Sequence, residues 1–121
     1  MDANELPTSG QKKVFPSGAQ RDGETGRGRY HLIPPCAIHA LAKRFEQGAE
    51  NYGVNNWMKG MPLSRLQDSI SRHLLAASEG DESEDHIGAI LWNAAAWMWT
   101  ENAIKEGQLP PELDDRIYTN G

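Results

Sequence analysis

Three segments of the chain carry apolar residues at the spacing of an amphipathic helix. The first begins at the prolines ending with Pro35, which suit the opening turn of a helix, and it stops at Gly53. Its apolar positions recur at i, i+3, i+4 and i+7 and are Ile38, Leu41, Ala42, Phe45, Ala49 and Tyr52. The second predicted helix runs from about Pro62 to Ser78, with Ser64 as a plausible N-cap. Its apolar stripe consists of Leu63, Leu66, Ile70, Leu74 and Ala77.

The third predicted helix follows an acidic loop, Glu79 to Glu84, and runs to about Lys105. Its apolar positions are Ile87, Ile90, Leu91, Ala94, Ala95 and Met98, with Trp92, Trp97 and Trp99 on other sides. Such a helix is predicted to be central or to lie at a subunit interface. One flank differs, because polar residues recur there at i, i+3, i+4 and i+11, namely Glu82, Asp85, His86 and Asn93. Solvated surface does not readily explain a polar row on an apolar helix.

The segments outside the predicted helices lack sustained periodicity. Residues 1–29 are rich in glycine, serine, proline and charge, so they are interpreted as an irregular arm, and residues 30–121 as the folded domain. Beyond Gly107, two consecutive prolines indicate an extended segment that packs on the helices, in which Asp114 and Asp115 have no evident helical partners. The predicted class is all-α, a bundle of about three to four helices completed by oligomerisation.

Composition narrows the classes of function. The 121 residues suffice for one domain with a modest core, and a formal net charge of -5 offers no general attraction to a nucleic-acid backbone. The single cysteine, Cys36, excludes an internal disulfide and favours a reducing compartment. The start of the chain lacks the pattern of a signal peptide, and no stretch approaches the roughly 20 apolar residues of a membrane span. We expect a soluble, cytoplasmic protein that binds neither nucleic acid nor membrane.

Two pairs of acidic residues are candidate metal ligands. Glu46 and Glu50 lie one helical turn apart beside the first apolar stripe, where their desolvation favours pairing with a cation. Glu82 and Asp85 begin the polar row of the third helix. Antiparallel packing would join the pairs into a cage of oxygen ligands suited to Mg²⁺ or Mn²⁺, with Glu46 or Glu50 as general base. The alternative for the first pair is two exposed acids near a helix end.

Candidate substrate contacts lie mostly between the two acid pairs. Arg72 and His73 share one face of the second helix and could hold phosphate oxygens, although surface charge explains them equally well. In the preceding connection, the Asn56 amide could read a base edge and Trp57 could stack on the base, whereas a tryptophan there more often fills the core. Arginines of the arm could wrap phosphates or simply be solvated. The candidate substrate-binding residues are Arg29, Asn56, Trp57, Lys59, Arg72, His73 and Asn93.

The sequence lacks the motifs of several other classes of enzyme. There is no GxxxxGK[ST] phosphate loop and no evident Ser/His/Asp or Cys/His arrangement. The four histidines are not placed as HExxH, and the order Asp85-His86 reverses the His-Asp pair of HD-type phosphohydrolases. Glu82 and His86 are four residues apart, so they lack the Glu-x-x-His spacing of di-iron carboxylate bundles.

Five stretches of the chain resemble a known family. They are Tyr30–Pro35, Phe45–Trp57, Pro62–Leu74, Glu84–Asn93 and Leu109–Asp115. In this order they are similar to the phage-associated MazG-like dATP/dGTP diphosphohydrolases, which include the MazZ type that occurs with 2-aminoadenine DNA synthesis. The resemblance implies an all-α nucleotide pyrophosphohydrolase fold, a dimer or tetramer, and Mg²⁺ or Mn²⁺ as cofactor.

The resemblance also bears on the site residues. The wider superfamily binds metal through paired acids on one helix and an ExxD on another, and Glu82 to Asp85 match that ExxD. Glu46 and Glu50 depart from the pattern, because they are four residues apart where the superfamily has acids three apart. The family often has Asp at the position of His31 and Lys at that of Asn51.

The function implied by the resemblance is hydrolysis of dGTP or dATP to the monophosphate and pyrophosphate. In the MazZ setting, the dGMP would supply 2-aminoadenine nucleotide synthesis. Two alternatives remain open at this point. One is a triphosphohydrolase that releases inorganic triphosphate from a dNTP, and the other is a non-catalytic helical interaction module whose tryptophans form a dimer interface.

Overall fold

The computed structural model describes residues 12–23 and 26–119, which fall into two compact units divided between Pro34 and Pro35. The first unit contains an antiparallel hairpin in which β1 (Lys13–Val14) pairs with β2 (Gln20–Arg21). It also contains the short 3-10 helix η1 (Tyr30–Leu32). The hairpin is an ordered element inside the segment that the sequence predicts to be an irregular arm. The division lies a few residues after the predicted start of the folded domain at residue 30.

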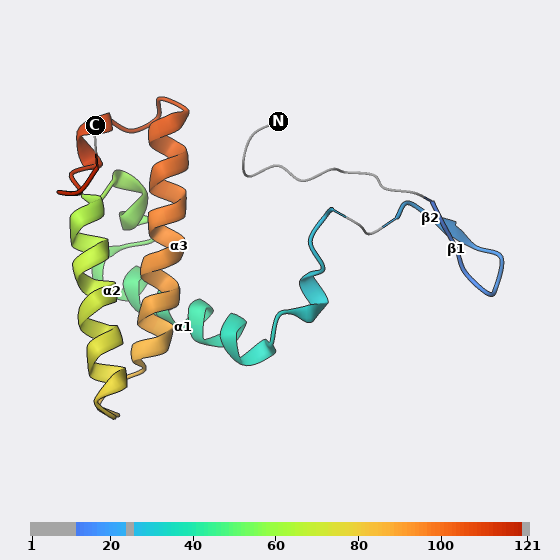
Figure 1. Cartoon of the computed structure of the whole chain (residues 1–121), viewed down its shortest axis with the longest axis horizontal. Coiled ribbons are helices and arrows are strands. Elements are labelled where there is room, and N and C mark those ends of the chain that lie inside the picture. The colour runs from blue at the N-terminus through green and yellow to red at the C-terminus, as the bar shows by residue number, and fades with distance from the viewer. Residues whose placement is uncertain (1–11, 24–25, 120–121) are drawn as a thin grey trace. The chain divides into compact units, whose positions relative to one another are not determined.

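The second unit is a helical bundle (Figure 1). Its long helices are α1 (Pro35–Tyr52), α2 (Leu63–Ser78) and α3 (His86–Lys105), and its short 3-10 helices are η2 (Asn56–Lys59) and η3 (Pro111–Leu113). Helices α2 and α3 run antiparallel side by side, and α1 also packs against α3. The all-α class is confirmed, and α3 occupies the central position that its apolar composition predicts. No helix within the described ranges has both the length and the apolar character needed to cross a membrane.

The core lies mainly between α2 and α3. Leu63 is fully buried, and Leu66 and Ala96 are each 2% exposed, with Met61, Trp92 and Trp97 packed around them. Burial of a leucine side chain contributes about 1.5–3 kcal/mol, so this contact holds α2 against α3.

Four aromatic rings join α1 and η2 to α3. The Phe45 ring lies 5.5 Å from the Trp57 ring and 5.9 Å from the Trp92 ring, measured between centroids. Trp57 also meets Trp99 edge to face, with centroids 4.9 Å apart. Edge-to-face pairs of this kind contribute about 0.5–1.5 kcal/mol beyond the burial of their surface. The cluster therefore fixes where η2 lies against the bundle.

The start of α3 corrects the predicted polar row. The helix begins at His86, so Glu82 lies in the preceding loop and Asp85 is the N-cap residue. The Asp85 carboxylate accepts the backbone N–H of Gly88 at 2.9 Å, and a Cβ at Gly88 would lie 2.2 Å from that carboxylate. Asn93 is buried and donates to the Ala89 carbonyl of its own helix at 2.8 Å. The four polar residues therefore do not share one flank of a helix. Glu82 lies in the loop, Asp85 caps the helix, and only His86 and Asn93 belong to α3.

The C-terminal tail caps α2, a role that Ser64 does not perform. The N-cap position of α2 is Pro62, which has no capping side chain. Instead, the Asp115 carboxylate accepts the backbone N–H of Ser64 at 2.9 Å and its hydroxyl at 2.6 Å. Asp114 forms two hydrogen bonds of 2.7 Å with Arg116, whose guanidinium lies over the Trp97 ring. Asp115 therefore has a helical partner that the sequence did not reveal, whereas Asp114 pairs within the tail.

Candidate functional site

A cavity of about 310 Å³ opens between α1, η2, α2 and α3 of the helical unit. Its polar lining comes from Arg44, Gln47, Asn51, Asn56, Ser69, His73 and Asn93, and its larger apolar surfaces come from Tyr52, Trp57, Met61 and Trp92. Ligand pockets in proteins typically begin at about 300 Å³ and combine apolar walls with a few placed polar groups. This cavity has both properties.

Four of the seven predicted substrate-binding residues line this cavity, namely Asn56, Trp57, His73 and Asn93. The structure brings them together from η2, α2 and α3. Arg72 is largely exposed and pairs with Asp68 on the outer side of α2 at 3.2 Å. Lys59 is exposed at the end of η2, and Arg29 belongs to the first compact unit. Substrate contacts by these three residues stay predictions.

The cavity wall also contains a polar atom that lacks a partner. The indole N–H of Trp92 is buried, and it has no hydrogen-bond partner among the described residues. A buried donor without an acceptor costs about 1–3 kcal/mol. Trp92 lines the cavity, but its Nε1 atom is covered by neighbouring groups, so a ligand acceptor would reach the indole N–H only after those groups move.

Three side chains form a hydrogen-bonded series beside His73. His86 Nε2 lies 2.5 Å from a carboxylate oxygen of Asp81, and His86 Nδ1 lies 2.8 Å from His73 Nδ1. The same Asp81 oxygen accepts the Ser83 hydroxyl at 2.6 Å. A carboxylate can only accept, so His86 Nε2 carries a proton, and a neutral His86 would then accept from His73 through Nδ1. The bonds from Ser83 and His86 lower the pKa of Asp81, which keeps it ionised.

Arg44 of α1 contacts the start of α3. One of its guanidinium nitrogens donates to the Glu84 carboxylate at 3.0 Å and to the Asp85 carbonyl at 2.7 Å. The hydrogen bond from Arg44 lowers the pKa of Glu84, so this carboxylate is charged at neutral pH. Arg44 also lines the cavity, where its remaining N–H groups can serve a ligand.

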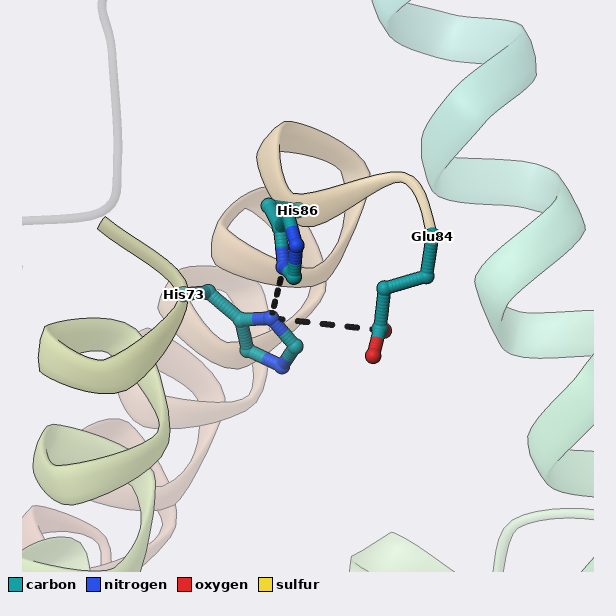
Figure 2. A group of neighbouring side chains, drawn as sticks. All are labelled: His73, Glu84 and His86. Carbon is teal, nitrogen blue, oxygen red and sulfur yellow. Dashed lines mark hydrogen bonds and ion pairs between the residues drawn. The ribbon is translucent and has the colours of Figure 1, made fainter. Parts of the chain in front are cut away.

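His73, Glu84 and His86 form a group that could hold a metal ion, as Figure 2 shows. One ligand atom from each lies within 4.8 Å of the other two. Burial lowers the pKa of His73, which outweighs the raising effect of Glu84 and favours the neutral imidazole that metals bind. Because His73 also lines the cavity, the group adjoins the space that a ligand would fill.

The two predicted acid pairs do not meet within one chain. Glu46 and Glu50 are exposed and do not line the cavity, and helical geometry places Glu46 nearly opposite Arg44. The described residues contain a single potential ligand group of three or more His, Cys, Asp or Glu side chains, which is the histidine-containing one. Glu82 and Asp85 line a second, shallow depression that Glu84 and His86 also line. A four-carboxylate cage is therefore absent from the described part of a single chain.

Sequence reasoning did not single out Arg44, Asp81 or Glu84 for the site. Arg44 directly precedes Phe45 at the edge of the first apolar stripe, a position from which its side chain reaches the neighbouring helix. Asp81 and Glu84 were grouped with the acidic loop. Their roles arise because α1 and α2 both contact the start of α3. Helical periodicity does not show which helices make contact.

Comparison with known proteins establishes the family. The family model described as dATP/dGTP diphosphohydrolase, N-terminal, matches residues 17–110, and the chain belongs to this family. A relative from Salmonella phage PMBT28, named dATP/dGTP diphosphohydrolase, is 29% identical over 65 residues. The aligned segment covers 54% of this chain but 22% of the relative, so the chain matches about a fifth of that protein's length. No solved structure matches the chain.

Proposed function

We propose that this chain hydrolyses purine deoxynucleoside triphosphates, dGTP or dATP, to the monophosphate and pyrophosphate. Water attacks the α-phosphorus, the bond to the bridging oxygen breaks, and pyrophosphate leaves. Membership of the dATP/dGTP diphosphohydrolase N-terminal family supports this reaction, as does the name of the phage relative. We propose a MazG-like enzyme of this kind, acting in the cytoplasm of a phage-infected host.

The cavity of the helical unit is the observation that carries the proposal. Trp57 and Trp92 provide broad apolar surfaces on which a base can stack. The Asn56 amide lies on the same wall as Trp57 and offers a donor and an acceptor for a base edge. We assign the purine to this side of the cavity.

Arg44 and His73 mark the phosphate side of the cavity. Both line it, and both contact the start of α3. The Arg44 guanidinium stays charged and has further N–H groups for phosphate oxygens. Since Glu84 and the Asp85 carbonyl hold Arg44 in place, its contribution to phosphate binding needs little reorganisation.

Dependence on Mg²⁺ or Mn²⁺ is part of the proposal. When bound, such an ion neutralises phosphate charge and activates water. Mg²⁺ commonly uses one or two protein carboxylates together with substrate phosphates, so Glu82 and the second oxygen of Asp85 are sufficient partners for a metal–nucleotide complex. Glu46 and Glu50 are both predicted metal ligands, and either is the predicted general base. They would need a second copy of the chain to reach such a complex.

A homodimer or homotetramer is accordingly proposed. Helix α3 carries exposed apolar side chains at positions 87 and 98, where Ile87 is 57% and Met98 is 66% exposed. Leu74 and Leu75 of α2 are also more than half exposed. Exposed apolar side chains on the long helices are the positions that a second copy of the chain could cover. Light scattering on the purified protein would measure the number of copies.

One assay distinguishes the proposed reaction from its two rivals. The protein is incubated with each dNTP and either Mg²⁺ or Mn²⁺, and the phosphate product is identified by ³¹P NMR. Pyrophosphate with dGTP or dATP supports the proposal, and inorganic triphosphate supports a triphosphohydrolase. Absence of turnover with every nucleotide and both metals supports a non-catalytic helical module. A preference for dGTP would agree with supply of dGMP for 2-aminoadenine nucleotide synthesis.

A further inference from the structure

We propose that His73, Glu84 and His86 bind one transition-metal ion of the Zn²⁺ class. These ligands differ from the predicted Mg²⁺ carboxylates Glu82 and Asp85, but Glu84 and His86 border the same depression as those carboxylates. The ligands come from two elements, because His73 lies on α2 while Glu84 and His86 lie at the start of α3. The site concerns the identity and position of a cation, so it does not depend on the proposed hydrolysis.

The positions of the ligand atoms suit one ion. The two Nδ1 atoms are 2.8 Å apart, and a carboxylate oxygen of Glu84 lies 4.0 Å from His73 Nδ1. Two nitrogens bound to a tetrahedral ion at about 2.1 Å would lie about 3.4 Å apart, so the two rings would separate by about 0.6 Å on coordination. The Glu84 side chain is 48% exposed, so its carboxylate can rotate by the small amount that coordination requires.

The groups around the ligands support coordination rather than a chance cluster. Metal-binding histidines almost always donate their other ring N–H to a carboxylate or carbonyl. Here Asp81 accepts from His86 Nε2 at 2.5 Å, and Ser83 in turn donates to Asp81. This contact directs the lone pair of His86 Nδ1 toward His73. His86 itself is 7% exposed, so its ring orientation is fixed by packing as well.

The chemistry of the donors selects the class of cation. Imidazole nitrogens suit Zn²⁺, Co²⁺, Ni²⁺ and Fe²⁺, whereas Mg²⁺ prefers oxygen ligands and retains its waters. Two histidines and one glutamate also leave coordination positions open, as in zinc sites that bind a water or substrate oxygen. Because His73 lines the cavity, an open position on this ion is accessible to a ligand there.

Metal binding at this site would change the tautomer of His73. Without an ion, and with both rings neutral, His73 Nδ1–H donates to His86 Nδ1. Coordination through Nδ1 moves that proton to Nε2 of the same ring, with no net change of charge. Histidine ¹⁵N chemical shifts distinguish the two tautomers. They therefore report metal binding directly, without a nucleotide.

Co²⁺ titration of the full chain tests the proposal, since bound Co²⁺ absorbs visible light and Zn²⁺ then displaces it. We expect one Co²⁺ per chain, displacement by equimolar Zn²⁺, and retention in a tenfold excess of Mg²⁺. His73→Gln and Glu84→Gln should each weaken Co²⁺ binding by about a hundredfold or more, and Asp81→Asn by about 10–100-fold. His39→Gln, which removes an exposed histidine of α1, is the matched control.

Folding and metal binding are separated by circular dichroism of each variant without metal. His73 and Glu84 are the preferred positions, because substitution of the buried His86 could unfold the start of α3. Unaltered Co²⁺ affinity in folded His73→Gln and Glu84→Gln proteins would overturn the assignment. So would displacement of Co²⁺ by Mg²⁺, or a His73 ring that keeps its Nδ1 proton at saturating Zn²⁺. Each of these results is independent of whether the protein hydrolyses dGTP.

Discussion

The Arg44 guanidinium of α1 donates to the Glu84 carboxylate at 3.0 Å, across 40 positions of the sequence. The same nitrogen reaches the Asp85 carbonyl, so one side chain joins α1 to the first turn of α3. Arg44 also lines the cavity beside His73. This contact therefore links the bundle to the side of the cavity assigned to phosphate.

Replacement of Arg44 should impair hydrolysis more than stability. We expect Arg44→Gln to lower kcat/KM for dGTP by about 10²–10³-fold, because a positioned donor to developing phosphate charge is removed. Arg44→Lys keeps the charge but not the planar donors, so it should recover only part of the loss. Steady-state kinetics with Arg65→Gln, an exposed arginine of α2, provide the comparison. Equal rates for Arg44→Gln and Arg65→Gln would exclude a phosphate contact by Arg44.

Asp85 caps α3 and is also a predicted metal ligand. The variants Asp85→Asn and Asp85→Ala distinguish these two roles. Asparagine caps helices as well as aspartate, so Asp85→Asn should keep the wild-type Tm. Asp85→Ala removes the acceptor for the Gly88 N–H and should lower stability by about 1 kcal/mol, or Tm by about 4–8 °C. Calorimetry measures both variants. If Asp85 also binds a metal, Asp85→Asn will lose activity at an unchanged Tm, and full activity would exclude that role.

The C-terminal tail should stabilise the bundle in a pH-dependent manner. Hydrogen bonds from Ser64 lower the pKa of Asp115 in the folded state. A depressed carboxyl pKa contributes stability above the unfolded value of about 3.9, and the contribution disappears as pH falls through the folded value. Asp115→Ala should therefore lower Tm at neutral pH, and the difference from wild type should narrow below about pH 4.

Two controls sharpen this measurement. Asp115→Asn keeps an acceptor without the charge, so its Tm should fall between those of wild type and Asp115→Ala and should vary less with acid. Glu112→Gln alters an exposed acid of η3 and should leave the profile of Tm against pH unchanged. A constant Tm difference between wild type and Asp115→Ala across the acid range would contradict the role of the charge.

Trp57 should affect both folding and substrate binding. Its ring packs on Phe45 and Trp99 and also lines the cavity. Trp57→Ala should cost about 3 kcal/mol of unfolding free energy, at the lower end for such changes because the ring is only half-buried. Trp57→Phe keeps an aromatic ring and should unfold near wild type while raising KM for dGTP. Urea unfolding and kinetics on both variants test this, and an unchanged KM in Trp57→Phe would assign the ring to packing alone.

The sequence was most informative where a property depends on neighbouring residues of one helix. The apolar spacing from Ile38 to Tyr52 predicted α1 correctly because residues three and four apart share a helical face. The all-round apolar character of α3 likewise predicted its central place. Capping was harder to predict, since the acceptor for the first turn of α2 comes from Asp115, 51 residues further along the chain. No local pattern encodes such a contact.

The cavity residues also separate what the sequence predicts from what only packing decides. Asn56, Trp57, His73 and Asn93 were predicted as substrate contacts from residue type, and the structure places all four on one cavity. Periodicity shows which residues share a face of one helix, but it does not show which faces meet. The direction in which α1 packs places Arg44 toward α3 and leaves Glu46 and Glu50 exposed.

The amino-acid sequence by itself determined the three helices, the central place of α3 and the resemblance to dATP/dGTP diphosphohydrolases. Only the tertiary structure decided that His73 of α2 meets His86 and Glu84 at the start of α3. It also decided that α3 begins at His86, one residue beyond the Asp85 cap. Successive side chains of a helix differ in direction by about 100°. Whether His73 and His86 face each other therefore depends on how α2 and α3 are rotated when they pack, and neither helix specifies that rotation by itself.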